Sequence, residues 1–281
     1  MINIGYRAAR LRGKIIRSLY RRSLTQIVKI SIPQTRKIKI AVYSLSCERD
    51  LPEQVASIRS FIRHVGIPDQ FTVISDGTYS RESCQLLRKI HPCVEIVDQQ
   101  KLVRTDLPQC IYDYAEHHPL GKKLAALISI QINQVTLYTD SDILFFPDAS
   151  ELITLAALDD KCSRYLLDCA ISLDERILYD ESEKLNPVNS GLILFKKQLD
   201  WSFGIERLVK CQESPNYFTE QTIVHLTMHY NHNVPLCSKR YVVSLDDQFI
   251  YSDNYANQKI ALRHYVNPVR HKFWFNVGMY S

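Results

Sequence analysis

The sequence lacks several features that would each assign it to a definite class of protein. No apolar run approaches the ~20 residues of a membrane-spanning helix, and the N-terminus lacks the apolar segment of a secretory signal, so we expect a cytoplasmic protein. The eight cysteines include no C-x-x-C pair, which favours reduced, half-buried thiols over zinc or disulfide roles. Neither G-x-G-x-x-G nor a Walker A sequence occurs, so neither a dinucleotide-binding fold nor a P-loop is predicted.

Acidic residues are absent from the first 47 positions, whereas residues 1–39 carry eleven Lys or Arg. Among these basic residues, Leu11, Ile15 and Leu19 recur at helical spacings, which predicts a basic amphipathic helix within 7–30. Such a helix can lie on an anionic membrane surface, and we expect the inner face of the membrane. Each basic residue near the surface adds ~1 kcal/mol to the binding free energy. A disordered leader and a helix packed on the body are the alternatives. A nucleic-acid-binding arm would be similar in charge, but we expect the helix to contact a membrane and not a nucleic acid.

A proline separates this leader from the rest of the chain. Pro33 disfavours a helical conformation at Ile32, and polar residues follow, so we place the leader at 1–37 and a single domain at 38–281. From Ile38 onward, strand patterns alternate with helical ones, which predicts an α/β domain with a mainly parallel sheet flanked by helices. The predicted strands are 38–44, 71–75, 94–97, one starting at 135, 164–171, 188–195, 241–244 and 259–265, and the predicted helices are 51–65, 80–90, 108–116, 122–132, 201–211 and 217–229.

The stretch from Val135 to Pro147, VTLYTDSDILFFP, carries the most informative motif. Its first residues are β-branched and aromatic, as in a buried strand, and Asp140 and Asp142 come where that strand should end. Side chains two positions apart on a strand point to the same side, so both carboxylates could hold a divalent cation, with a diphosphate as third partner. In open α/β sheets such ligands bind beyond the carboxyl ends of the strands. A structural role, such as capping the next segment, is the alternative.

Residues 38–275 carry several features in an order that resembles the GT-A fold glycosyltransferases. The nearest group is that of glycogenin and the bacterial lipopolysaccharide glucosyl- and galactosyltransferases. The features are an opening strand and helix, GKKLAAL before the motif strand, D-S-D, the N-S-G strand, and a late histidine ahead of a Lys and a Trp. The resemblance implies a Rossmann-like domain that moves a sugar from a nucleotide-diphosphate donor, with UDP as the nucleotide, to an acceptor hydroxyl. The acceptor is not identified; a glycan or lipid-linked molecule would fit the basic leader.

The resemblance also assigns a metal site. Asp140 and Asp142 match the family's D-x-D motif and would bind Mn²⁺ (or Mg²⁺), and His264 matches the late histidine that completes the site. The family has a Gly three residues after that histidine and a Pro between the last Lys and Trp. This chain has neither, and His271 therefore competes with His264 as the ligand.

Further roles follow from the same resemblance. Glu220 and Gln221 match an acidic-Gln pair near the reacting sugar; an inverting enzyme would need a carboxylate such as Glu220 as general base, whereas the glycogenin group retains configuration, which favours retention here. Independently of the family, Asp76 follows the second predicted strand and is a candidate to contact the nucleoside. The resemblance implies donor contacts for Lys123, Asn189, Gly191 and Lys272.

Other functions fit parts of this pattern. A haloacid-dehalogenase-type phosphatase also uses D-x-D after a strand, and Asp246 and Asp247 could mimic its later acidic pair, but its motif opens the catalytic domain and here it follows three strands. A sugar-nucleotide pyrophosphorylase would need a Gly-rich loop after the first strand, and 44–47 contains no glycine. A catalytically inactive GT-A-like binding module at a membrane surface is the third alternative, against which both aspartates argue.

Overall fold

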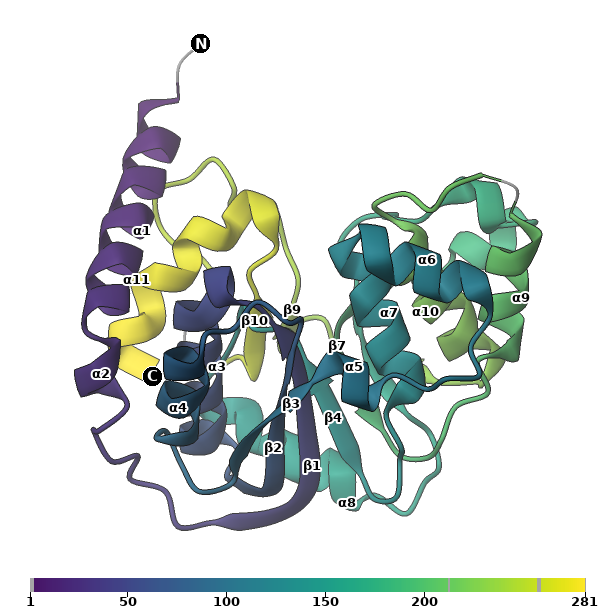
Figure 1. The fold of residues 1–281 in the computed structure, drawn as a ribbon. Coiled ribbons are helices and arrows are strands. Elements are labelled where there is room, and N and C mark those ends of the chain that lie inside the picture. Colours follow the sequence, from purple (N-terminus) through teal and green to yellow (C-terminus); the bar gives the residue numbers. More distant parts are fainter. Residues whose placement is uncertain (1–2, 212, 257–258, 281) are drawn as a thin grey trace.

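A computed structural model of the chain describes residues 3–211, 213–256 and 259–280. Seven strands of this part form one sheet in the order β3-β2-β1-β4-β7-β6-β8 (Figure 1). All neighbouring pairs are parallel except those of β7, which runs antiparallel to both β4 and β6, so the predicted mainly parallel sheet is confirmed. The strands are β1 Lys37–Ser46, β2 Ile67–Ser75, β3 Val94–Asp98, β4 Thr136–Thr139, β6 Arg164–Leu167, β7 Val188–Phe195 and β8 Val234–Pro235.

A second, three-stranded sheet has the order β5-β10-β9, with β5 Ile143–Phe145, β9 Tyr241–Val242 and β10 Leu262–His264. The D-S-D motif lies in the turn that joins β4 of the main sheet to β5 of this small sheet. The two aspartates are therefore not on one strand, and strand alternation is not what brings them together. Instead, β10 pairs antiparallel with β5, which puts His264 opposite Ile143, the residue after Asp142.

Helices cover both faces of the main sheet because its strands are apolar on both sides. In β1, Ile40 and Val42 pack into the core that includes α3, while Tyr43 and Leu45 pack against the core of α6, α7 and α10. The predicted helices are all present, whereas α5, α8 and α11 were not predicted. The bounds are α3 Leu51–His64, α4 Arg81–Arg88, α5 Gln99–Leu102, α6 Gln109–His117, α7 Pro119–Ser129, α8 Glu151–Ala157, α9 Ser202–Lys210, α10 Thr219–Tyr230 and α11 Arg270–Tyr280.

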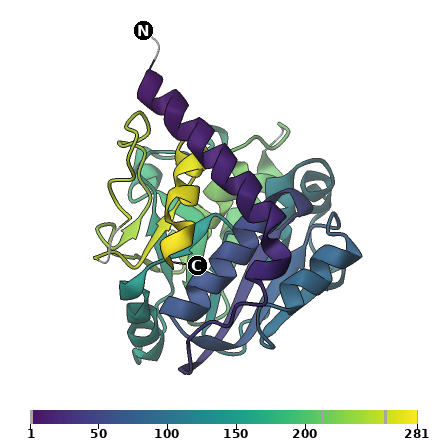
Figure 2. The same ribbon diagram turned by 90° about the vertical axis from the view of Figure 1, so that its left-hand side faces the viewer.

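The N-terminal segment forms α1 (Ile4–Arg22) and α2 (Leu24–Ile27), and α1 lies along α11 (Figures 1 and 2). Its second half is anchored: the ring of Tyr20 lies 5.4 Å from that of Trp274, and Leu24 is part of the core. Arg17 also forms an ion pair, at 2.6 Å, with the buried carboxylate of Glu53 in α3. Of the alternatives for this segment, a helix packed on the body describes this half.

The opposite face of α1 remains exposed. Ile4, Leu11, Ile15 and Leu19 are between 51% and 77% exposed and follow one another at helical spacings, so they form one apolar stripe away from α11. Figure 2 shows that the first turns of α1 extend beyond the rest of the molecule. None of the helices in the described ranges is both long and apolar enough to cross a membrane.

All eight cysteines are free thiols, with Cys169 and Cys237 exposed and the others partly buried.

A buried ion cluster of Arg263, Lys272, Asp247 and Asp253 lies beneath the segment 244–256. The guanidinium of Arg263 is fully enclosed and lies 2.7 Å from an Asp247 carboxylate oxygen, and it also contacts Asp253. The cluster fixes this segment, whose residues Phe249 and Tyr251 contact α1.

Candidate active site

Acidic and amide side chains gather at one edge of the main sheet, where its parallel strands end. Asp76 follows β2, Asp98 ends β3, Asp140 follows β4 and Asp168 follows β6. Because β7 runs the other way, its beginning lies at this same edge and contributes Asn189. These side chains thus lie at the carboxyl ends of the parallel strands, which is where open α/β sheets bind ligands.

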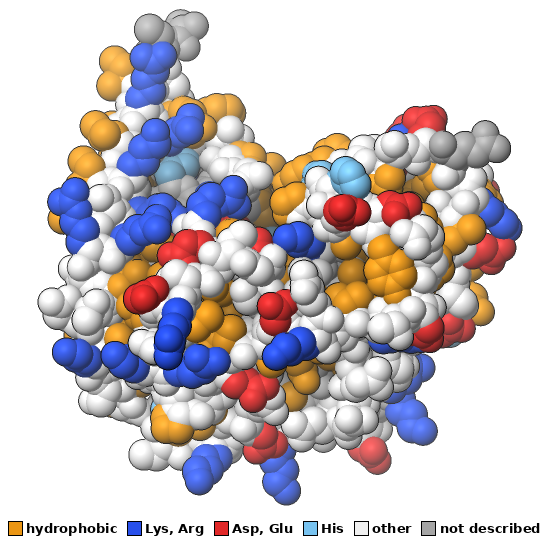
Figure 3. Space-filling model, in the orientation of Figure 1, with side chains coloured by type: hydrophobic (Ala, Val, Ile, Leu, Met, Phe, Trp, Pro, Cys, Tyr) orange, Lys and Arg blue, Asp and Glu red, His pale blue; other side chains and the backbone are white. Residues whose placement is uncertain are grey.

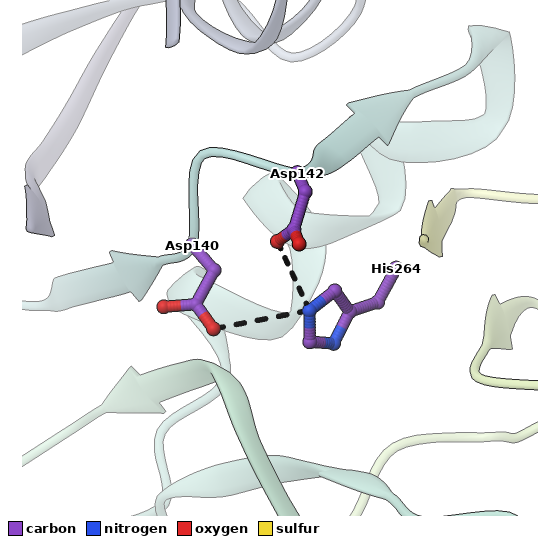
Figure 4. A group of neighbouring side chains, drawn as sticks. All are labelled: Asp140, Asp142 and His264. Atoms are coloured by element: carbon purple, nitrogen blue, oxygen red, sulfur yellow. Dashed lines mark hydrogen bonds and ion pairs between the residues drawn. The ribbon is translucent and has the colours of Figure 1, made fainter. Parts of the chain in front are cut away.

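Asp140, Asp142 and His264 come together at this edge (Figure 4). His264 Nε2 lies 3.1 Å from Asp142 Oδ1 and 3.8 Å from Asp140 Oδ2, and ligand atoms of the three side chains all lie within 4.8 Å of one another. His271, the competing histidine, lies elsewhere: its ring packs edge-on against Tyr6 of α1 at 5.6 Å. The structure therefore brings His264, and not His271, to the two aspartates.

The orientation of the His264 ring is set by Asn189. The Asn189 side-chain oxygen accepts the backbone N–H of Gly191 at 3.0 Å, so it must accept from His264 Nδ1, 2.8 Å away, as well. Nδ1 then carries a proton, and Nε2 faces the carboxylates. A Cβ on Gly191 would lie 2.3 Å from the His264 ring, so only glycine leaves room for this arrangement.

Lys123 balances the charge of Asp140 from the side of α7. Its ammonium lies 2.7 Å from Asp140 Oδ2, and Tyr138 donates to the other oxygen at 2.9 Å. Burial alone would lower the pKa of Lys123, but Asp140 and Glu220 raise it above its usual value. Glu220 is itself buried, and its pKa is raised by burial and by Asp140. One Glu220 oxygen accepts from Ser190 at 3.1 Å, and the other has no hydrogen-bond partner in the described chain.

On the other side of the site, Asp142 is held by a residue that the sequence did not reveal. Arg270, the first residue of α11, lies 3.7 Å from Asp142 Oδ2 and 3.1 Å from Asp50. Burial raises the pKa of Asp142, but the positive charge of Arg270 is the largest of the causes that outweigh burial and hold the pKa well below its usual value. Asp142 therefore stays ionised across the physiological range.

A pocket of about 180 Å³ opens beside the motif, and we call it the donor pocket because the sequence predicts donor contacts for Asp76 and Lys123, which line it. It lies between the end of β1, the loop after β2, the N-terminus of α7 and the D-S-D turn, and both Asp76 and Lys123 line it. The carbonyl of Asp76 accepts from Lys122 at 2.9 Å, and its carboxylate accepts from Thr78. A helix N-terminus and two lysines at one wall suit an anionic ligand.

Two further predicted residues, Gln221 and Lys272, form no hydrogen bond or ion pair with the group of three in the described chain. Gln221 donates to the carboxylate of Asp168 at 2.9 Å, at the same sheet edge; Asp168 was missed although it follows a strand as Asp76 and Asp140 do. Lys272 is not at the site: its ammonium is enclosed in the buried ion cluster, 3.0 Å from Asp247 and 2.6 Å from the Ser252 carbonyl. The cation that faces the motif from this part of the chain is Arg270.

The residues at the motif fit a divalent cation. Two carboxylate oxygens and one imidazole nitrogen converge, and when this nitrogen carries no proton the three acceptors would repel one another unless a cation lay among them. Carboxylates are the ligands that Mg²⁺ and Mn²⁺ prefer, and neutral imidazole is a common metal ligand. A histidine whose other nitrogen donates to an amide oxygen is also how proteins orient metal-binding rings. Asp140, Asp142 and His264 would therefore hold the ion.

No family model and no curated protein matches this chain. Solved structures do match it. The galactosyltransferase LgtC, in complex with donor and acceptor sugar analogs, is 14% identical with a TM-score of 0.57, covering 86% of this chain and 96% of LgtC. The glycosyltransferase GlyE of Streptococcus pneumoniae TIGR4 is 14% identical with a TM-score of 0.56, covering 86% and 61%. Mouse xyloside xylosyltransferase 1 is 11% identical with a TM-score of 0.50, covering 84% and 99%. The chain thus has the GT-A fold of these glycosyltransferases.

Proposed function

We propose that the protein is a metal-dependent glycosyltransferase that moves a sugar from a UDP-sugar to an acceptor hydroxyl. The observation that carries the proposal is the convergence of Asp140, Asp142 and His264 beside the donor pocket, at the sheet edge where α/β folds bind ligands. The GT-A fold supports it, since the similar LgtC was solved with donor and acceptor sugar analogs. In this proposal, Asp76 contacts the nucleoside, and Asn189 and Gln221 lie beside the donor sugar.

The residues supply what glycosyl transfer requires. A leaving diphosphate gains negative charge as the bond to the sugar breaks, and a bound Mn²⁺ or Mg²⁺ would neutralise part of it as a Lewis acid. Lys123 and Arg270 add two fixed positive charges on either side of the motif. Glu220 is enclosed behind Lys123, which suits a role in fixing the lysine better than removal of a proton from an acceptor. This favours a retaining outcome.

The first test is calorimetric titration of UDP into the purified protein with manganese, with magnesium, and with EDTA. We expect binding with either metal and none in EDTA, because the carboxylates would repel the diphosphate when no cation lies between them. CDP, GDP and ADP serve as matched ligands that carry the same diphosphate. Hydrolysis of a UDP-sugar then separates an enzyme from an inactive binding module. Failure of every nucleoside diphosphate to bind would contradict the proposal.

The geometry also weakens the phosphatase alternative. That reading needs a late acidic pair beside the D-x-D motif, and Asp246 and Asp247 were its candidates. Asp246 is exposed and accepts from Ser244 and Tyr255 of its own segment. Asp247 is fully buried in the ion cluster with Arg263 and Lys272, so it is not free to serve there.

We further propose that the protein works at the inner face of a membrane, with α1 as the contact and a glycan or lipid-linked molecule as acceptor. The apolar stripe of α1 is flanked by basic residues such as Arg7 and Lys14, the combination that binds anionic lipid surfaces. In Figure 3, basic and hydrophobic side chains alternate along this helix. Because the second half of α1 is packed on α11, the helix would hold the body at the surface rather than act as a flexible tether.

Replacing Leu11 and Ile15 together with Asp should weaken binding to vesicles of phosphatidylcholine and phosphatidylglycerol at least about tenfold, since each buried aliphatic side chain contributes about 1.5–3 kcal/mol. Both side chains are exposed, so the fold should be unaffected. Co-sedimentation with vesicles measures the effect. Leu158→Asp, a change at an exposed leucine after α8, is the control and should bind like the wild type. Undiminished binding by the double variant would remove the membrane contact from the proposal.

A further inference from the structure

A second hollow, of about 350 Å³, lies between α1, the start of α3 and α11, and we call it the basic groove. Figure 3 shows Lys and Arg side chains gathered where α1 meets the central hollow of the molecule. Gly13 and His271 bring the two helices into close contact here: a Cβ on Gly13 would lie 2.5 Å from the His271 carbonyl oxygen. The charged residues that line it are Arg10, Lys14, Arg17, Arg49, Asp50, Glu53 and Arg270.

The basic groove has more positive charge than its own carboxylates can neutralise. Five of its charged residues are cationic and two are acidic, which leaves a surplus of three positive charges. Both carboxylates are already paired, Glu53 with Arg17 at 2.6 Å and Asp50 with Arg49 and Arg270 at 3.1 Å each. Arg10 and Lys14 lie one helical turn apart and are exposed, and neither forms an ion pair with any carboxylate of the described chain.

The basic groove is continuous with the donor pocket. Arg49, Asp50 and Arg270 line both, and Arg270 also lies 3.7 Å from Asp142 of the motif. A ligand in the groove would therefore lie next to a donor whose diphosphate is held at the motif. Because the donor's own negative charge is accounted for there, a second anion in the groove must belong to the other substrate.

We propose that the basic groove binds a phosphate or diphosphate group of the acceptor. Arginine pairs with phosphate through two parallel hydrogen bonds and lysine adds a compact charge, so Arg10 and Lys14 together suit such a group. The site lies at the base of α1, whose outer face carries the apolar stripe, so the phosphate can come from a lipid-linked acceptor or from a soluble phosphorylated one. This inference rests on the proposed glycosyl transfer.

The test uses the double variant Arg10→Ala with Lys14→Ala. Each full-length protein is first saturated with UDP and magnesium, which reports on the donor pocket alone, and is then titrated with inorganic diphosphate or farnesyl diphosphate in the calorimeter. We expect UDP binding to be unchanged and the dissociation constant for diphosphate to rise at least about tenfold, since hydrogen bonds between charged groups are stronger than those between neutral groups. Arg22→Ala with Lys29→Ala, which removes two exposed charges outside the groove, is the control.

Equal diphosphate binding by the wild type and the Arg10/Lys14 variant would overturn the inference. Loss of UDP binding in the wild type would instead overturn the proposed function, so the two failures are distinguishable. Tighter binding of farnesyl diphosphate than of inorganic diphosphate would identify a lipid-linked acceptor, and equal binding a soluble phosphorylated one. Both of these results support a phosphate-binding site in the basic groove.

Discussion

Replacing Asp142 with Asn is expected to abolish metal-dependent UDP binding and to lower turnover of the donor about a thousandfold, or about 4 kcal/mol. The amide keeps the shape of the side chain but removes the charge that holds the cation. It also leaves His264 Nε2, 3.1 Å away, without its carboxylate partner. Calorimetric titration of UDP with manganese measures binding, and the electron paramagnetic resonance signal of free Mn²⁺ measures the ion directly.

Asp98→Asn is the matched control for this change. Asp98 also ends a strand at the same sheet edge, but it caps α5 through the backbone N–H of Gln100, a bond that an Asn side chain can still accept. The control should bind UDP and manganese like the wild type. If the Asp142→Asn variant bound UDP and manganese as tightly as the wild type does, the motif could not be the metal site. The proposed function would then lose the observation that carries it.

The second large effect concerns stability. Replacing Arg263 with Ala should lower the free energy of unfolding by about 3–5 kcal/mol, because it leaves Asp247 and Asp253 buried without their main counter-charge. The guanidinium also lies between the rings of Tyr255 and Tyr265, 4.9 and 5.0 Å from their centres, so the truncation removes packing as well. Urea denaturation followed by circular dichroism measures the loss.

Arg240→Ala provides the comparison, since Arg240 pairs with Asp148 and Glu151 at the surface and is 36% exposed. That change should lower the free energy of unfolding by at most about 1 kcal/mol. Similar losses of stability from Arg263→Ala and Arg240→Ala would contradict this account.

The buried ion cluster also predicts that the protein loses stability in acid. Burial raises the pKa of Asp247, but Arg263 and Lys272 outweigh it and lower the pKa. Its stabilisation is thus complete at neutral pH and is lost as the pH falls through the lowered value.

Much of the fold, and the grouping of Asp140, Asp142 and His264, could be predicted from the sequence. The alternation of apolar strands and amphipathic helices is a local property, so β1 to β4 and their helices were within reach. Asp140 and Asp142 stood out because they form a D-x-D pair where an apolar strand should end. His264, by contrast, depended on family order, since a lone histidine after a short strand carries no pattern of its own.

The parts that could not be predicted depend on tertiary packing. The sequence predicted strands at 241–244 and 259–265, where β9 and β10 lie, but not the three-residue β5. These strands are too short for any periodicity to show that they pair with one another in a separate sheet. The basic residue from the C-terminal segment was placed at Lys272 instead of Arg270 for a similar reason. Positions two apart on a helix point about 200° apart, and which of them faces the motif depends on how Phe273 and Trp274 seat α11 in the core.

The pairing of β10 with β5 has a consequence for how the protein is made. Asp142 and His264 are separated by 122 positions, so a chain leaving the ribosome cannot bring Asp140, Asp142 and His264 together until residue 264 has emerged. Partly folded chains would offer at most the two aspartates, with far weaker affinity for the ion. The cation would consequently bind the finished fold almost exclusively and would draw the folding equilibrium toward completion by mass action. Manganese capture during refolding would thus report the last step of folding rather than the first.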